Sequence, residues 1–259
     1  MVTRILTPVR ILRPEFITGG CVLDLKMDEG EGVVVRDSSG YGNHGDLRPG
    51  PAPNYPGWVD GYYGKALSFD GVDDWVKVPH APSLAIQEGT VELWIYPISH
   101  KVGWNRIIEK GRYDAQGYRI IQHTDPPFRL DAHIYDKAGI TKETPWTEFP
   151  LNQWSFLTMV FRKGFLGLYK NAELVTKRTD NITGAVTGTS DLMIGSDFGG
   201  NENTNVIIDE VRIYNRALTS KEIKAHFLEA RAPKVRKLAL VLLAYAALMG
   251  IWVAGRRKR

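Results

Sequence analysis

Residues 90–96 read Thr-Val-Glu-Leu-Trp-Ile-Tyr, and their alternation decides the fold class. Successive side chains of a strand point to opposite faces, so this stretch places Val91, Leu93 and Ile95 on one wholly aliphatic face. A strand with one aliphatic face predicts packing against a second sheet. The opposite face carries Glu92, Trp94 and Tyr96. Such an aromatic face is either a binding surface or packed beneath a loop, and the packed arrangement is the more common.

Similar short runs, separated by clusters of Gly, Pro, Asn and Asp, continue along residues 20–216. They predict an all-β fold, a sandwich of two sheets that forms one domain over residues 20–230, after an N-terminal extension at 1–19. The predicted strands are Val22 to Lys26, Ala66 to Phe69, Trp75 to Val78, Thr90 to Tyr96, Arg106 to Lys110, Tyr118 to Gln122, Arg129 to Ile134, Ser155 to Arg162, Leu166 to Tyr169, Leu174 to Lys177, Leu192 to Ile194 and Val206 to Tyr214.

One short helix is expected at the end of this domain. Thr219 and Glu222 have the spacing of a capping box, ahead of the apolar residues Ile223 and Phe227. The helix is expected to end near residue 230, because Pro233 follows shortly afterwards.

The positive charge of the chain is concentrated after this helix. The whole chain has a formal charge of +4, but residues 231–259 hold eight Lys and Arg and no acidic residue. Residues 1–230 therefore carry 25 basic against 29 acidic residues, a net charge of −4. A mildly acidic domain disfavours nucleic acid as a partner, because nucleic-acid binding rests on cations that meet phosphates. The single cysteine, Cys21, excludes an intrachain disulfide framework.

The basic tail encloses an apolar segment that predicts a membrane anchor. Residues 238–255 read Leu-Ala-Leu-Val-Leu-Leu-Ala-Tyr-Ala-Ala-Leu-Met-Gly-Ile-Trp-Val-Ala-Gly. As a helix they extend about 27 Å, close to the roughly 30 Å hydrocarbon core of a bilayer. A basic linker at 231–237 and a basic tail at 256–259 flank the segment. We expect a single-pass protein with a C-terminal anchor.

The orientation of this anchor stays open at the level of sequence. Four Lys or Arg precede the segment and four follow it, so the positive-inside rule does not choose a direction. The first 16 residues contain three arginines and two prolines and do not form the apolar region of a signal peptide. We place the domain on the outer surface of a cell or virion as an expectation.

Three motifs resemble the concanavalin A-like lectin/glucanase superfamily, in its laminin-G-like branch. They are Asp37-Ser-Ser-Gly-Tyr-Gly-Asn-His-Gly45, Gly61-Tyr-Tyr-Gly-Lys-Ala-Leu-Ser-Phe-Asp-Gly-Val-Asp-Asp-Trp-Val76 and Ile208-Asp-Glu-Val-Arg-Ile-Tyr-Asn-Arg-Ala-Leu218. The resemblance covers about residues 20–230 and implies a jelly roll of two antiparallel sheets. It also places the last strand beside the N-terminal strand. Asn171-Ala172 departs from the Asn-Gly usual in the family, and because Ala is strained in a type I′ turn we expect another turn type there.

Catalytic signatures of the superfamily are missing from the sequence. Its glucanases take two carboxyl groups from Glu-x-Asp-x-Glu or Glu-x-Asp-x-x-Glu on one strand face, and retaining hydrolysis needs them about 5 Å apart. No Glu in this chain is followed by Asp two residues later, and Glu92 stands alone on its strand. We therefore expect no enzyme activity. The Gly40-x-Gly42-x-x-Gly45 match to a dinucleotide fingerprint precedes three prolines instead of a helix, and we interpret it as chance.

Calcium is the expected ion, because it binds carboxylate and carbonyl oxygens of irregular loops. The resemblance implies one structural site at Asp209 with oxygen atoms from the Asp24 region, between the first and last strands. It implies ligand-site calcium at Asp114 and Asp197, in the loops that carry it in pentraxin-like relatives. The alternative for each residue is a carboxylate that caps a turn or faces water. The sequence does not indicate ligand-binding residues or the oligomeric state.

Three functions remain after these exclusions. The first is a non-catalytic, membrane-anchored recognition module that binds a glycan or a protein. The second is a structural envelope or membrane protein that contacts mainly other proteins. The third is a divergent glycoside hydrolase with an unrecognised acid pair, and we rank the three in this order.

Overall fold

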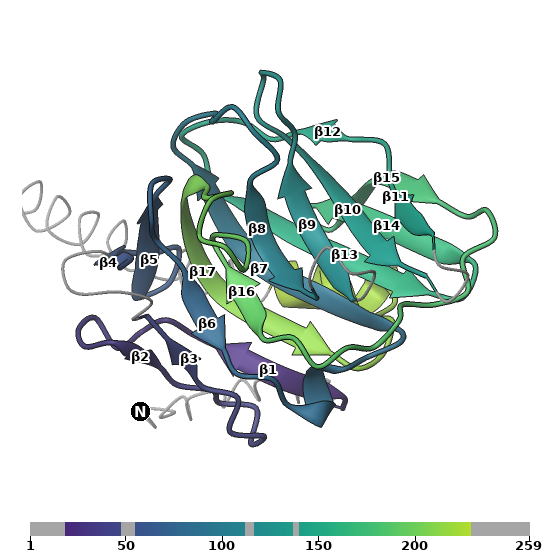
Figure 1. Ribbon diagram of the computed structural model, residues 1–259, viewed down its shortest axis with the longest axis horizontal. Coiled ribbons are helices and arrows are strands. Elements are labelled where there is room, and N and C mark those ends of the chain that lie inside the picture. The colour runs from purple at the N-terminus through teal and green to yellow at the C-terminus, as the bar shows by residue number, and fades with distance from the viewer. Residues whose placement is uncertain (1–18, 48–54, 112–116, 137–139, 229–259) are drawn as a thin grey trace, which may run out of the picture.

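Strand β7 (Gly89–Pro97), which contains the alternating residues 90–96, lies in the middle of one of two antiparallel sheets that pack face to face (Figure 1). The computed structural model describes residues 19–47, 55–111, 117–136 and 140–228. In Figure 1 the strands β8, β9 and β10 of one sheet lie in front of β7 and β13 of the other. The two-sheet sandwich predicted from the sequence is confirmed.

The first sheet has eight strands. Strand β17 lies within it and pairs with three neighbours, β7, β5 and β1. In spatial order the strands are β15 (Glu173–Arg178), β14 (Phe165–Lys170), β13 (Ser155–Arg162), β7, β17 (Asn205–Tyr214), β5 (Lys65–Asp70) and β4 (Gly57–Asp60), with β1 (Cys21–Leu25) also paired to β17. The predicted pairing of the last strand with the N-terminal strand is therefore confirmed.

The second sheet has nine strands and carries the pocket described below. In order they are β11 (Thr141–Glu143), β10 (Arg129–Tyr135), β9 (Tyr118–Gln122), β8 (Arg106–Lys110), β16 (Leu192–Ile194), β6 (Val76–Val78), β3 (Gly45–Asp46) and β2 (Val34–Val35), with β12 (Thr147–Glu148) paired to β10. A short 3-10 helix, η1 (Pro82–Leu84), precedes β7. All twelve predicted strands are present, and within the described ranges the structure adds five short strands that we did not predict: β2, β3, β4, β11 and β12.

The main core fills the space between the two sheets. Val91, Leu93 and Ile95 are fully buried in it, as their alternation predicts. On the outer face of the first sheet, Trp94 lies in a second apolar cluster and is only 3% exposed. Its ring stacks on Tyr62 at 3.5 Å and lies 5.9 Å from Phe227, in the helix at residues 220–228. The aromatic face is thus packed, by a helix and a loop residue, and is not an open binding surface.

The helix begins with the predicted capping box. Glu222 N donates to Thr219 Oγ1 at 3.3 Å, and Thr219 N donates to Glu222 Oε2 at 2.6 Å. These reciprocal bonds satisfy amides that no helical carbonyl can reach. From the same helix His226 Nδ1 reaches the buried carboxylate of Glu92 at 2.8 Å, which fixes the helix to β7.

The hairpin between β14 and β15 corrects one expectation. Lys170 pairs with Glu173, so Asn171 and Ala172 form a two-residue loop, with φ angles of 54° and 68°. Positive φ at both positions is what a type I′ turn requires, so the expectation of another turn type was wrong. Tertiary contacts hold the strained Ala in place: Phe156 N donates to Asn171 Oδ1 at 2.9 Å, and Ala172 is only 8% exposed.

Several predictions concern residues outside the described part of the chain. These are most of the N-terminal extension, the basic linker, the anchor at 238–255, the basic tail and Asp114. Within the described ranges, no helix has both the length and the apolar character needed to cross a membrane.

Candidate functional site

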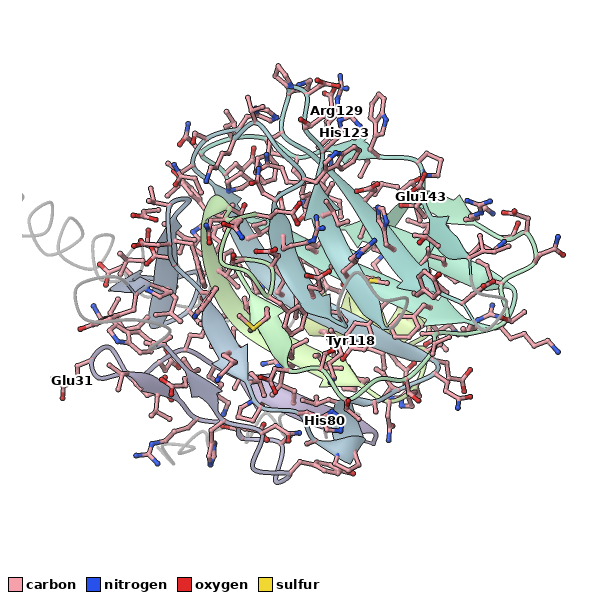
Figure 2. The ribbon with its side chains drawn as sticks, viewed as in Figure 1. Glu31, His80, Tyr118, His123, Arg129 and Glu143 are labelled. Carbon is pink, nitrogen blue, oxygen red and sulfur yellow. The ribbon has the colours of Figure 1, made fainter. Side chains whose placement is uncertain are left out.

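A pocket of about 630 Å³ opens where the β11 edge of the second sheet approaches the β15 edge of the first. Its floor comes from β10 and β11, its rim from the segments around residues 104, 123 and 144–146, and its far wall from residues 177–180. Figure 2 shows His123 and Arg129 at one end of this face and Glu143 beside it. Segments up to about 75 residues apart in sequence thus meet around one cavity.

Two tryptophans on the pocket rim are half-exposed. Trp104 is 45% and Trp146 is 48% exposed, although burial of such a side chain is favourable. The ring of His123 lies 4.8 Å from Trp104 and 5.9 Å from Trp146. The guanidinium of Arg129 lies 4.0 Å from the Trp146 ring centroid, which restrains that ring. The rim is therefore an ordered aromatic surface open to solvent.

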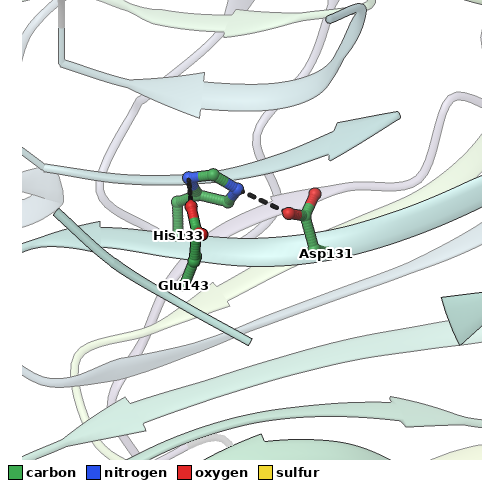
Figure 3. Close-up of side chains that lie close together, drawn as sticks. All are labelled: Asp131, His133 and Glu143. Carbon is green, nitrogen blue, oxygen red and sulfur yellow. Dashed lines mark hydrogen bonds and ion pairs between the residues drawn. The ribbon is translucent and has the colours of Figure 1, made fainter. Parts of the chain in front are cut away.

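The floor of the pocket is polar. Asp131 and His133 are two residues apart on β10 and so share a face, while His133 is directly opposite Glu143 of β11 in the register. His133 Nε2 lies 2.8 Å from Asp131 Oδ2, and His133 Nδ1 lies 3.7 Å from Glu143 Oε2. Figure 3 shows the imidazole between the two carboxylates. The sheet register therefore builds this triad.

A buried ion network stiffens the same sheet beside the triad. Arg106 contacts Glu202 at 2.6 Å and Glu109 at 3.5 Å, and Arg119 contacts Glu109 at 3.3 Å. Burial raises the pKa of Glu109, and the two arginines oppose this shift. Breaking such a buried pair on one side leaves an uncompensated charge, so the network favours a single arrangement of the floor.

The sequence-predicted metal ligands do not converge on the pocket. Asp24 Oδ1 accepts from Arg212 Nε at 3.0 Å on the neighbouring strand. Asp197 Oδ1 accepts from the amides of Asn201 at 2.8 Å and Glu202 at 3.2 Å, within its own loop. Among the described residues, the two clusters of three ligand-type side chains are Asp131, His133 and Glu143, and Asp70, Asp73 and Asp74. Neither includes Asp24, Asp197 or Asp209.

Asp209 nevertheless has surroundings that suit a calcium ion. It is fully buried, Tyr63 N donates to its Oδ2 at 2.9 Å, and its Oδ1 has no hydrogen-bond partner in the described part of the chain. A Cβ added to Gly61 would lie within 2.7 Å of three oxygens, namely Tyr63 O, Lys65 O and Asp209 Oδ2. Burial, together with the charges of Glu210 and Asp28, raises the pKa of Asp209 to about 8, although the hydrogen bond from the Tyr63 amide acts to lower it. Several oxygen atoms thus converge beside a buried carboxylate that the protein alone does not keep charged. A hard cation such as calcium binds oxygen ligands of this kind.

The family follows from comparison with known domains. The Laminin G 3 family model, described as "Concanavalin A-like lectin/glucanases superfamily", matches residues 70–224. The chain belongs to this superfamily. A search of curated protein sequences gave no significant match. The resemblance seen in the sequence motifs is thereby confirmed at the level of the family and of the fold.

Solved structures of this superfamily fold share little sequence with the chain. The binding domain of Paraclostridial Mosquitocidal Protein 1 is 18% identical, with a TM-score of 0.65 over 80% of this chain and 52% of that one. The binding domain of Botulinum Neurotoxin DC, solved in complex with SialylT, is 14% identical, with a TM-score of 0.62 over 82% and 52%. Domain 4 of AbnA, a GH43 extracellular arabinanase from Geobacillus stearothermophilus solved in complex with arabinotriose, is 19% identical, with a TM-score of 0.59 over 79% and 96%. The chain thus spans about half the length of the toxin binding domains.

Few features of the sequence predict the pocket in this superfamily member. Asp131 and His133 lie at i and i+2 of a predicted strand, which does place them on one face. Trp104 and Trp146 lie outside every predicted strand, and two tryptophans between turn residues are a usable signal for an exposed aromatic surface. Their distance from each other and from the triad depends on strand pairing across the sheet.

Proposed function

We propose that this chain is a non-catalytic recognition module that binds a glycan in the pocket beside Trp104 and Trp146. The observation that carries the proposal is the half-exposed aromatic rim above a polar floor. One face of a sugar ring is largely C–H and packs on an indole, while the hydroxyl groups at its edge need hydrogen-bond partners. The tryptophans of the rim supply the apolar surface, and Asp131, Glu143 and Lys177 supply hydrogen-bonding groups.

Two similar structures support a glycan as ligand. One was solved in complex with SialylT and the other in complex with arabinotriose. Because both are less than 20% identical to this chain, the class of ligand is proposed and the particular sugar is not.

The triad geometry argues against the hydrolase alternative. Retaining glycosidases hold two carboxyl groups about 5 Å apart on either side of the scissile bond. Here Asp131 and Glu143 both face the ring of His133, and the carboxylate of Asp131 is buried against it. One oxygen of Asp131 and one of Glu143 lie within 4.8 Å of each other, but the imidazole of His133 lies between the two carboxylates, where a scissile bond would have to lie, and the side chain of Asp131 is only 6% exposed. We therefore favour binding without bond cleavage.

We further propose that calcium supports the domain at Asp209 and that the C-terminal segment holds the domain at a membrane, on the outer side. Asp209, with Asp28 and the carbonyls of Tyr63 and Lys65, would hold the ion and fix the loop at residues 61–65 to β17. Calcium would neutralise a buried carboxylate there and take no part in the pocket. The apolar residues 238–255 support the anchor.

A glycan array followed by calorimetry tests the binding proposal. The full chain should retain at least one glycan, and Trp146→Ala should weaken its binding about ten-fold or more, since truncation of an aromatic residue that anchors a binding site commonly costs about 2 kcal/mol or more. Tyr41→Ala is the matched control, because Tyr41 is a 56% exposed aromatic on the loop before β3. The proposal fails if no glycan is retained, or if Trp104→Ala and Trp146→Ala bind as tightly as the wild type.

A further inference from the structure

The triad at the pocket floor has an excess of negative charge. Asp131 and Glu143 bring two carboxyl groups to one imidazole, so acidic groups outnumber the single basic group of the cluster. Two of the basic residues nearby are engaged with other carboxylates. Arg119 contacts Glu109, and Arg178 is held by Asp180 at 2.7 Å and 2.9 Å. Over the described ranges, no Lys or Arg forms a salt bridge with the carboxylate of Asp131 or Glu143.

Two buried atoms of the triad also lack hydrogen-bond partners. Asp131 is 4% exposed and His133 6% exposed, yet Asp131 Oδ1 and His133 Nδ1 have no hydrogen bond within the described part of the chain. Buried polar atoms are nearly always satisfied, so an unsatisfied pair beside a pocket needs a reason. A bound cation is such a reason, because it uses lone pairs that no protein donor takes.

The geometry around His133 is that of an oriented metal ligand. A neutral imidazole that donates Nε2–H to Asp131 Oδ2, at 2.8 Å, keeps its lone pair on Nδ1. Metal-binding histidines usually donate their other N–H to a carboxylate in this way, which fixes the ring and raises its basicity. The free lone pair of Nδ1 faces Glu143 Oε2 at 3.7 Å.

The spacing of these two atoms suits a transition metal. Donors bound to tetrahedral zinc at about 2.1 Å lie about 3.4 Å apart, so the 3.7 Å gap closes with a small movement of one side chain. The side chain of Glu143 is 57% exposed and can make that movement. Calcium fits poorly, because it takes oxygen ligands, whereas imidazole with a carboxylate suits zinc and its neighbours in the first transition row.

We propose that His133 Nδ1 and the Glu143 carboxylate bind a divalent transition-metal cation such as zinc, with Asp131 as the residue that orients the imidazole. The other coordination positions face the pocket and take water or a ligand oxygen. The cation takes the lone pair of His133 Nδ1, which no protein donor uses, and reduces the negative charge of the triad. This site is separate from the Asp209 region, and metal binding does not require that the pocket take a glycan.

Zinc titration of the full, tag-free chain tests the site, with the metal alone and no glycan present. Calorimetry with zinc should give one site that calcium does not fill, and cobalt should give visible absorption bands of a nitrogen- and oxygen-bound ion. Glu143→Gln should weaken zinc binding about ten-fold or more, and Asp131→Asn about ten-fold, as loss of an orienting carboxylate does elsewhere. His133→Ala should abolish binding and the cobalt bands.

Control variants separate metal binding from a folding defect. His44→Ala removes an exposed histidine before β3 and should bind zinc as the wild type does. Because Glu143 is largely exposed, Glu143→Gln should leave the far-UV circular dichroism and the unfolding midpoint unchanged, so its weaker binding would report on the metal. The proposal is overturned if the wild type binds no zinc, if calcium competes at the same site, or if His133→Ala and Glu143→Gln bind zinc unchanged.

Discussion

Replacement of Asp209 by Asn should make the domain more stable at neutral pH in a chelator. Asp209 is buried, and its pKa is raised from 3.8 to about 8, first by burial and then by the charges of Glu210 and Asp28. Between these two values the folded chain holds a proton that the unfolded chain releases. The contribution of this carboxyl group to the free energy of unfolding is therefore fully present below about pH 4 and decreases as the pH rises toward 8.

The size of the effect follows from the same shift. Each unit of pKa difference corresponds to about 1.4 kcal/mol, so the three units between about pH 4 and pH 7 give a loss of up to about 4 kcal/mol. Asn has the same shape, carries no charge and keeps an oxygen for the Tyr63 amide. Asp209→Asn should match the wild type near pH 4 and exceed it increasingly toward pH 8.

Urea unfolding in EDTA, followed by tryptophan fluorescence across this pH range, measures the difference between the two proteins. Asp60→Asn is a suitable control, because the side chain of Asp60 is 91% exposed and this variant should gain no stability as the pH rises. A difference that stays flat from about pH 4 to pH 8 would refute the reasoning, since a raised pKa must appear as a slope. Calcium at about 100 times its dissociation constant should narrow the difference at neutral pH by about 2.7 kcal/mol, because it stabilises only the wild type.

Three further changes have defined outcomes. Thr219→Ala should lower the unfolding free energy by about 1 kcal/mol in urea titrations through loss of the helix cap, and an unchanged midpoint would contradict the role of the capping box. Ala172→Val should lower the unfolding free energy by at least about 1 kcal/mol relative to Ala172→Gly, because a β-branched residue at a φ of 68° is more strained; equal stabilities would count against the type I′ turn. Asn181 is exposed in an Asn-Ile-Thr sequon, so in eukaryotic cells an outward-facing domain should gain a glycan that Asn181→Gln removes, as a gel shift shows. An unmodified chain would argue for the opposite orientation.

The sequence by itself determined that the strands form two layers and which strand face packs between them. Alternation in residues 90–96 assigned Val91, Leu93 and Ile95 to the core, because a strand offers only two faces and one must be buried. The cap at Thr219 could also be predicted, since its partners lie within one turn of helix. Local patterns of this kind suffice wherever the interacting groups are neighbours in the chain.

Only the tertiary structure decided what covers Trp94 and what surrounds His133. Trp94 is covered by Tyr62 and Phe227, which come from distant segments. His133 meets Glu143 because the register of β10 and β11 sets them opposite each other, and a shift of one residue would turn the two away. The rim tryptophans line one pocket with Asp131 and Glu143 because antiparallel pairing brings separate loops to the same end of a sheet. The sequence identifies the residues of the site, but strand pairing and the packing of the two sheets fix the distances between those residues.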